Sequence, residues 1–378
     1  MRAIGPFQME TPKSVRFGAG SLSHLGSHAD GARRILLLTG QRNAGREGLP
    51  QQITALCEGR DLQQAVCPRG EPTTEGVQAL RETIASPPDL IVAFGGGSVL
   101  DTAKALSALL RHPGRPEEFL EGVPGSRPIP GPCIPWIGVP TTAGTGAEAT
   151  KNAVLKSASL GVKRSMRSPF LMADSVIVDP FLTRGLPPGV LGATGMDAFV
   201  QLLEAYVSRR STVPVRALVR SAMTAHLDGL RTLAGSPQDE DARTAISYGA
   251  LVSGIALANA GLGAAHGFAA AVGGLFPIPH GLLCAVFLPT VLSLNAEQIR
   301  ADITELFSGI ATGDPVVWLS QRVRSTAALF GLPEDLRSFA IPKSLVPELA
   351  RLSAGSSMRG NPRDLTQEEK ESAISLLI

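Results

Sequence analysis

A glycine-rich turn between an apolar run and an amphipathic segment constrains the fold of this chain more than any other feature. Residues 91–94 (IVAF) are apolar and rich in β-forming residues, which predicts a buried strand. Gly95, Gly96 and Gly97 follow directly, and an amphipathic helix is predicted next, with Ser98 as its N-cap and Asp101 three residues further on. Glycines let the backbone approach a ligand, and a helix start offers free N–H groups and partial positive charge. A phosphate or diphosphate is the expected ligand. The alternative is a glycine turn that only connects the strand to the helix.

Strand and helix patterns alternate through the N-terminal half. Strands are predicted within residues 13–20, 32–40, 62–67, 134–139 and 175–178, and helices within 50–57, 75–86 and 97–112. This alternation predicts an α/β domain with an open, mostly parallel sheet, in which ligands bind beyond the carboxyl ends of the strands.

From about residue 185 the pattern becomes helical throughout. Apolar-periodic segments without strand alternation cover residues 191–208, 213–233, 239–259, 264–274, 282–295, 301–310, 315–329, 345–352 and 366–377. We therefore predict an α/β domain at residues 1–184 and an all-helical domain at residues 185–378.

No Asp, Glu, Lys or Arg occurs between Arg243 and Glu297, which raises the alternative of a membrane span. Histidines, an asparagine and prolines interrupt this stretch, and no basic flanks bracket it, so a buried helical core is predicted instead. A net charge of +2 without Lys/Arg blocks argues against a nucleic-acid partner. Four cysteines without CxxC spacing and an N-terminus without an apolar run predict reduced thiols and a cytoplasmic location.

Three polar residues in apolar surroundings indicate a second site. His266 and His280 lie within the uncharged stretch, and Asp197 lies in an apolar helical pattern. A buried imidazole requires a polar partner. A carboxylate and two imidazoles that converge are a normal ligand set for Zn²⁺ or Fe²⁺ with positions left open for substrate. The alternative is that each histidine bonds to a backbone carbonyl.

The chain resembles the iron-containing (group III) alcohol dehydrogenases, a superfamily that includes glycerol dehydrogenases and maleylacetate reductases. The motifs that carry the resemblance cover nearly the whole chain: FGAG at 17–20, GGGS at 95–98 with Asp101 and Lys104, PTTAGTG at 140–146, GMDA at 195–198, HG at 266–267, PHG at 279–281 and NPR at 361–363. The resemblance implies a dehydroquinate synthase-like scaffold, with a nucleotide-binding Rossmann-like domain and a helical domain for metal and substrate.

The resemblance also assigns roles to residues. The cofactor-binding set is Gly95, Gly96, Gly97 and Ser98 around the diphosphate, Asp101 in the same motif, Thr141, Thr142 and Thr145 along the nucleotide, and Lys163 near the ribose or nicotinamide. Asp197, His266 and His280 match the family's metal ligands and carry the catalytic role.

Three positions depart from the family pattern. Gln201 replaces a histidine ligand four residues after Asp197, and an amide oxygen is a weak ligand, so Gln201 is a doubtful one. Ala270 replaces a histidine that many relatives carry near the nicotinamide. Gly40 replaces an acidic residue that binds the ribose 2′-hydroxyl, and Arg42 is close enough in sequence to pair with a 2′-phosphate.

The expected activity is hydride transfer between NAD(H) or NADP(H) and an alcohol or carbonyl substrate, in the cleft between the domains. A divalent metal, zinc or iron, is expected to assist as a Lewis acid. A cytoplasmic homodimer without nucleic-acid or membrane partners is expected. The alternatives are a metal-independent reductase of the maleylacetate reductase type, a lyase of the dehydroquinate synthase type and a non-catalytic nucleotide-binding protein.

Overall fold

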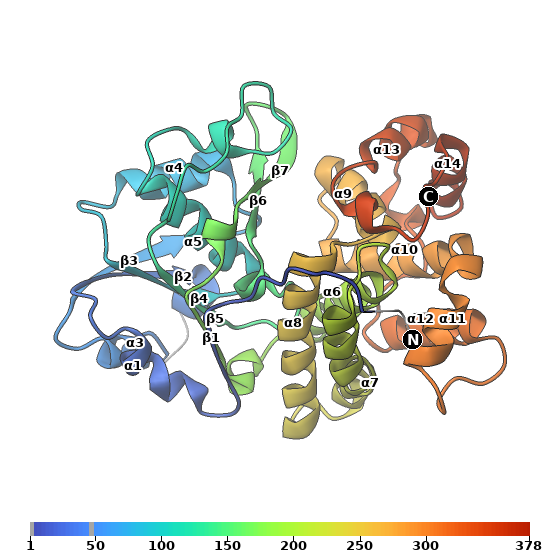
Figure 1. Ribbon diagram of the computed structural model, residues 1–378, viewed down its shortest axis with the longest axis horizontal. Helices are drawn as coiled ribbons and strands as arrows, with labels where there is room; N and C mark the ends of the chain where they lie inside the picture. The colour runs from blue at the N-terminus through green and yellow to red at the C-terminus, as the bar shows by residue number, and fades with distance from the viewer. Residues whose placement is uncertain (1–3, 45–48) are drawn as a thin grey trace. The chain divides into compact units, whose positions relative to one another are not determined.

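The structure is a computed structural model that describes residues 4–44 and 49–378, and it divides into two compact units (Figure 1). An α/β unit contains residues 10–142 and 146–183. A helical unit contains residues 184–378 together with two short segments, residues 4–9 and Ala143–Thr145.

The α/β unit is built on a six-stranded sheet in which every strand pair is parallel, as predicted. The strand order is β1 (Ser14–Phe17), β8 (Ser175–Val178), β5 (Trp136–Pro140), β4 (Leu90–Gly95), β2 (Arg34–Gly40) and β3 (Asp61–Cys67). The chain passes outward from β2 to β3 and then returns to the other side of β2 to form β4. This reversal makes the carboxyl ends of β2 and β4 the switch point at which such sheets bind ligands.

Helices cover the sheet because its central strands are apolar on both faces. The helices of this unit are α1 (Leu25–His28), α2 (Gln41–Ala44), α3 (Leu49–Leu56), α4 (Thr74–Glu82) and α5 (Gly97–Leu109). Alternate side chains such as Leu37 and Phe94 share one buried cluster with Leu25 of α1 and Ile53 of α3. Helix α5 contacts β2, β4 and β5. The strands therefore show the continuous hydrophobic pattern of a sheet that is buried on both faces.

One element of this unit escaped the sequence prediction. Strands β6 (Asn152–Ser157) and β7 (Val162–Arg167) form an antiparallel hairpin outside the main sheet. Its strands are short and carry lysine and arginine side chains, so the hydrophobic signal is weak. Short 3₁₀ turns complete the unit: η1 (Ser21–His24), η2 (Pro116–Phe119), η3 (Ala147–Ala149), η4 (Pro169–Leu171) and η5 (Pro180–Thr183).

The helical unit packs its helices around one apolar core. Its helices are α6 (Pro188–Val207), α7 (Val213–Gly235), α8 (Glu240–Ala260), α9 (Ala264–Leu275), α10 (His280–Leu294), α11 (Ala296–Leu306), α12 (Pro315–Leu329), α13 (Val346–Leu352) and α14 (Gln367–Ser375), with 3₁₀ turns η6 (Arg337–Phe339), η7 (Lys343–Leu345) and η8 (Ser357–Gly360). The all-helical prediction is confirmed.

Several predicted helix boundaries were wrong, and those of α10 and α11 bear on the site. Helix α10 begins at His280 rather than at residue 282, because Pro279 takes the N-cap position. Helix α11 covers Ala296–Leu306 rather than 301–310, because Asn295 is both the C-cap of α10 and the N-cap of α11.

The uncharged stretch forms most of α8 and all of α9 and α10, which are largely buried within the unit. No single helix among the described residues is long and apolar enough to cross a membrane. Two helix pairs meet the length and composition requirement only when joined, and they bend by 97° (α8 with α9) and 110° (α10 with α11).

Candidate nucleotide loop and metal centre

The glycine turn, Gly95–Gly97, connects β4 to α5 at the switch point of the sheet. Helix α5 begins at Gly97, its N-cap Gly96 is extended, and no side chain hydrogen-bonds to cap it among the described residues. The prediction of Ser98 as the N-cap was therefore wrong, because the helix begins earlier and Ser98 lies in its first turn. A Cβ at Gly96 would lie 3.2 Å from Cγ2 of Thr142, so a side chain there would be crowded. An uncapped helix start bordered by glycine is the arrangement that binds a phosphate group.

Two of the three predicted threonines lie beside this turn. The Thr141 N–H donates to the Gly95 carbonyl at 3.0 Å, and its hydroxyl accepts from Asn43 Nδ2 at 3.2 Å. Thr142 contacts the turn at Gly96. Thr145 belongs to the helical unit.

Asp101 joins α5 to the hairpin. Its Oδ1 accepts from Lys104 Nζ at 2.9 Å, and its Oδ2 accepts from the Val154 N–H at 3.0 Å. Lys104 is fully buried and also donates to the Thr150 hydroxyl and the Asn152 carbonyl, each at 2.7 Å. Burial lowers the pKa of Lys104, and the Asp101 carboxylate opposes this shift. Both residues of the motif thus hold the structure around α5 in place.

The remaining predicted cofactor residues lie at the end of β2, in α2 and on the hairpin. Gly40 ends β2, and a Cβ there would lie 3.3 Å from Cγ2 of Val99. Arg42 lies in the next segment, α2, and is exposed. Lys163 lies on β7, where it forms an ion pair with Glu71.

In the helical unit, four side chains from three helices converge on one point. Asp197 comes from α6, His266 from α9, and His280 and Cys284 from α10. One potential ligand atom from each of these residues lies within 4.8 Å of all the others. We call this group the metal cluster. His266 Nε2 lies 3.3 Å from Asp197 Oδ1, and Cys284 Sγ lies 3.7 Å from His280 Nε2.

Glu204 orients His266 from the side away from Asp197. The Glu204 carboxylate accepts from His266 Nδ1 at 2.7 Å, from the Gly263 N–H at 2.8 Å and from the Ala265 N–H at 2.7 Å. Glu204 and His266 are both buried. A carboxylate that holds one imidazole nitrogen directs the other nitrogen toward a metal and raises its basicity.

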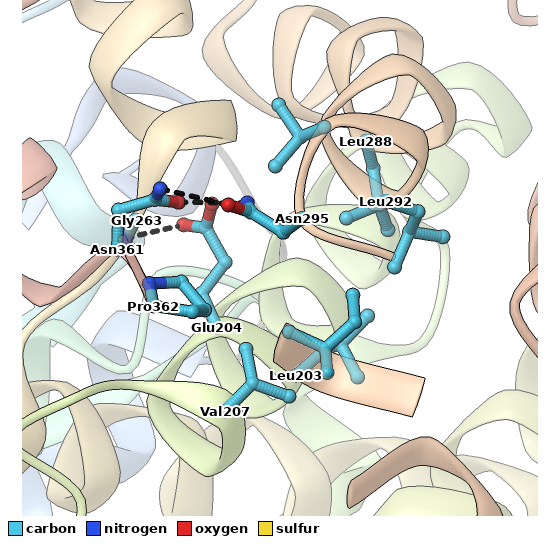
Figure 2. A pocket seen from close by; sticks show the side chains of 11 residues that line it. Leu203, Glu204, Val207, Gly263, Leu288, Leu292, Asn295, Asn361 and Pro362 are labelled. Atoms are coloured by element: carbon cyan, nitrogen blue, oxygen red, sulfur yellow. Dashed lines mark hydrogen bonds between the residues drawn. The ribbon is translucent and has the colours of Figure 1, made fainter. Parts of the chain in front are cut away.

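The NPR motif at residues 361–363 supports the start of α9, the helix that carries His266. The Asn361 side chain accepts from the Ala264 N–H at 3.3 Å, and it exchanges two hydrogen bonds with Asn295, at 2.9 and 3.0 Å. Figure 2 shows these two asparagines beside Glu204, at one side of a small internal cavity that Leu288 and Leu292 line. The motif thereby ties the start of α9 to the end of α10.

Glycine allows α10 to approach α6. A Cβ at Gly281 would overlap the Ala193 carbonyl and would lie 3.1 Å from Cβ of Asp197. Because His280 precedes this contact, the glycine sets the separation between His280 and Asp197.

Burial and charge act in opposite directions on the cluster. Burial favours the neutral acid, but the hydrogen bond from His266 and the charges of His280 and His266 outweigh it, so the pKa of Asp197 is lowered. Burial disfavours the imidazolium, but contacts with Cys284, Asp197 and Glu204 outweigh it, so the pKa of His266 is raised well above its usual value. Burial raises the pKa of the Cys284 thiol to about 12.

Gln201 and Ala270, two positions that depart from the family pattern, lie on helices that also carry residues of the metal cluster. Gln201 lies one turn after Asp197 on α6, is buried, and its Oε1 accepts from the Ser253 hydroxyl at 2.8 Å. Ala270 lies on α9 and is exposed.

Sequence reasoning missed Cys284 and Glu204. The sequence predicted that α10 begins at residue 282, which left His280 outside the helix. The prediction therefore did not place His280 and Cys284 one turn apart on the same helix. Glu204 lies two turns after Asp197 on an apolar helix. A second acidic residue on the same helix face as Asp197 could have indicated that it belongs to the site.

Comparisons with known proteins agree with this architecture. Residues 12–180 match the family described as iron-containing alcohol dehydrogenase, and residues 192–375 match the C-terminal domain of the Fe-containing alcohol dehydrogenase family. The chain is 32% identical to long-chain-alcohol dehydrogenase 1 of Geobacillus thermodenitrificans, with 85% of this chain and 83% of the relative covered. It is 30% identical to the NAD-dependent methanol dehydrogenase of Bacillus methanolicus, with 88% and 86% covered.

A solved structure shows the same fold. The iron-containing alcohol dehydrogenase from Thermococcus thioreducens superposes with a TM-score of 0.88 at 30% identity, covering 98% of this chain and 99% of that one. The chain belongs to the iron-containing alcohol dehydrogenase family. It is an enzyme of that oxidoreductase class, as the sequence motifs implied.

Proposed function

We propose that this enzyme interconverts a small alcohol and its aldehyde or ketone, using a nicotinamide cofactor and a divalent metal. The observation that carries the proposal is the convergence of the buried Asp197 and His266 with the half-buried His280, in a unit that matches the family's C-terminal domain. The relatives' names span methanol and long-chain alcohols, so we assign no chain length to the substrate.

The donor set fits a divalent metal. One carboxylate, two imidazoles and a thiol offer the ligand types that zinc and iron prefer, and their atoms are already close together. A metal held by Asp197, His266 and His280 would supply Lewis-acid polarisation of the substrate oxygen. We keep Gln201 outside the main ligand set, because Ser253 already donates to its amide oxygen.

The chain's own groups prepare this site. Glu204 holds the His266 Nδ1 proton and thereby fixes the ring orientation and tautomer. Asp197, His266 and Cys284 are buried beside an apolar core, and a low local dielectric strengthens electrostatic interactions at the substrate oxygen.

Cofactor binding is assigned to the α/β unit, residues 1–184 in our division. The N–H groups at the start of α5 would hold the diphosphate, with Gly95, Gly96, Gly97 and Ser98 as the turn. Nicotinamide supplies the hydride acceptor or donor when it is bound. Thr141 and Thr142 border this turn, and we retain Thr145, Lys163 and Asp101 as cofactor residues by resemblance alone.

We further propose that NADPH is accepted. Gly40 places no carboxylate at the end of β2, and the exposed Arg42 follows it, so a 2′-phosphate meets no repulsion and has a cation nearby. A cytoplasmic homodimer completes the proposal.

Steady-state kinetics with elemental analysis tests this function. We expect aldehyde-dependent oxidation of NADPH or NADH, one equivalent of zinc or iron, and loss of activity after chelation. Full activity in metal-free protein would refute the metal-assisted reaction and favour the metal-independent reductase type. For the cofactor, R42Q should lower kcat/KM for NADPH and leave NADH unchanged. The matched control R33Q, at the opposite end of β2, should change neither.

A further inference from the structure

Position 201 lacks the imidazole that the metal-binding pattern of the family places there. Gln201 points its amide oxygen toward Ser253, which donates to it at 2.8 Å, and both residues are buried. The fourth ligand position on α6 is therefore filled by a weak donor that is already engaged in a hydrogen bond.

A stronger donor lies on the neighbouring helix. Cys284 follows His280 by one turn of α10, so both side chains lie on one face of that helix. Its Sγ lies 3.7 Å from His280 Nε2, and within 4.8 Å of the ligand atoms of Asp197 and His266.

We propose that Cys284 is the fourth protein ligand of the metal, so that α10 supplies a His–Cys pair and α6 supplies Asp197 alone. This inference depends on the divalent metal of the proposed function and adds a thiolate to it. Cys284 and His280 then bind through the i, i+4 spacing that Asp197 and a histidine at position 201 would have used.

The geometry is compatible with four protein ligands, and zinc can expand to five-coordinate, which leaves a position for the substrate oxygen. Zinc–sulfur bonds of about 2.3 Å and zinc–nitrogen or zinc–oxygen bonds of about 2.0 Å place tetrahedral ligand atoms about 3.3–3.6 Å apart. The His266–Asp197 and Cys284–His280 pairs, at 3.3 and 3.7 Å, are already at about this separation, and no other pair in the cluster exceeds 4.8 Å. Among the described cysteines, Cys57 and Cys67 are buried in the α/β unit and belong to no such group.

A thiolate changes which metal the site prefers. Sulfur favours zinc or iron over magnesium, calcium or manganese. Two anionic ligands, Asp197 and Cys284, would also balance the charge of a divalent ion within an apolar core. We therefore expect zinc to be retained more strongly than manganese.

X-ray absorption of the wild-type zinc protein tests the assignment without any variant. We expect one sulfur neighbour at about 2.3 Å, together with nitrogen and oxygen neighbours at about 2.0 Å. One bound zinc with only nitrogen and oxygen neighbours would overturn the Cys284 assignment and leave the metal site of the proposed function intact. Protein that binds no zinc at all would overturn both.

Cobalt substitution identifies the sulfur. Cobalt-loaded wild type should show a thiolate-to-metal absorption band in the near ultraviolet, and C284S should lose it and bind cobalt about tenfold or more weakly. Q201L should keep the band, because it removes only the amide, and the control C133A should keep both band and affinity. A band that persists in C284S, or that disappears in Q201L while C284S retains it, would overturn the proposal.

Discussion

Replacing Glu204 with glutamine tests the role of the carboxylate behind His266. Glu204 Oε2 accepts from the Gly263 N–H and from His266 Nδ1, and Oε1 accepts from the Ala265 N–H. Glutamine keeps the size of the side chain but offers only one acceptor oxygen. If that oxygen takes the Oε2 position, the amide NH₂ faces the Ala265 N–H, which then has no acceptor in a buried place.

The cost follows from these three bonds. An unsatisfied buried N–H costs roughly 1–3 kcal/mol, and the two remaining bonds lose about 1 kcal/mol each when their acceptor becomes neutral. We expect E204Q to lower the free energy of unfolding of the helical unit by about 3–5 kcal/mol. We also expect metal affinity to fall about 10–100-fold, because the orientation of His266 is no longer fixed.

Denaturant unfolding and metal titration measure the two effects. The control E240Q removes an exposed glutamate on α8 that pairs with Arg184, and such a pair contributes about 1 kcal/mol or less. If E204Q unfolded at the wild-type denaturant concentration and bound zinc with wild-type affinity, the carboxylate would not position His266.

Three further substitutions test other parts of the structure. G281A should displace α10 from α6, because a Cβ at this position would overlap the Ala193 carbonyl. We expect the free energy of unfolding to fall by about 1–3 kcal/mol or more and zinc to be lost. An unchanged zinc content would refute the role of Gly281 in placing α10. G40D should raise the ratio of kcat/KM for NADH over NADPH about tenfold or more, and an unchanged ratio would refute the role of this position. Burial raises the pKa of Glu148 to about 7, so wild-type stability should fall by up to about 3 kcal/mol as pH rises from 4.5 to 7. E148Q should remove this slope in denaturant unfolding, and a slope that persists would assign it elsewhere.

The sequence predicted the fold well because the apolar runs of the central strands and the apolar periodicity of the helices were both strong. Residues 35–38 and 91–94 are continuous apolar runs, and they became central parallel strands. The helices of the second unit kept their apolar period through the uncharged stretch. The β6–β7 hairpin was missed because each strand has only six residues, and lysine and arginine side chains weaken its hydrophobic pattern.

The site was predictable only where a residue's type was unusual for its surroundings. Asp197, His266 and His280 stood out as polar groups in apolar helices, and the structure brings them together. Cys284 did not, since a cysteine among leucines is an ordinary core residue. Its spacing from His280 on one helix face became visible only in the structure, where α10 begins two residues earlier than predicted. Helix ends are the least certain part of such a prediction.

The bond from Asn361 to the start of α9 has a consequence for biosynthesis. The residue that holds Ala264 in place is made 97 positions after it, long after all four side chains of the metal cluster have left the peptidyl transferase centre. A nascent chain that already contains every ligand therefore still lacks one of the groups that fix its His266 helix. Ions captured at that stage would meet a less ordered site, and selective loading should follow the arrival of Asn361.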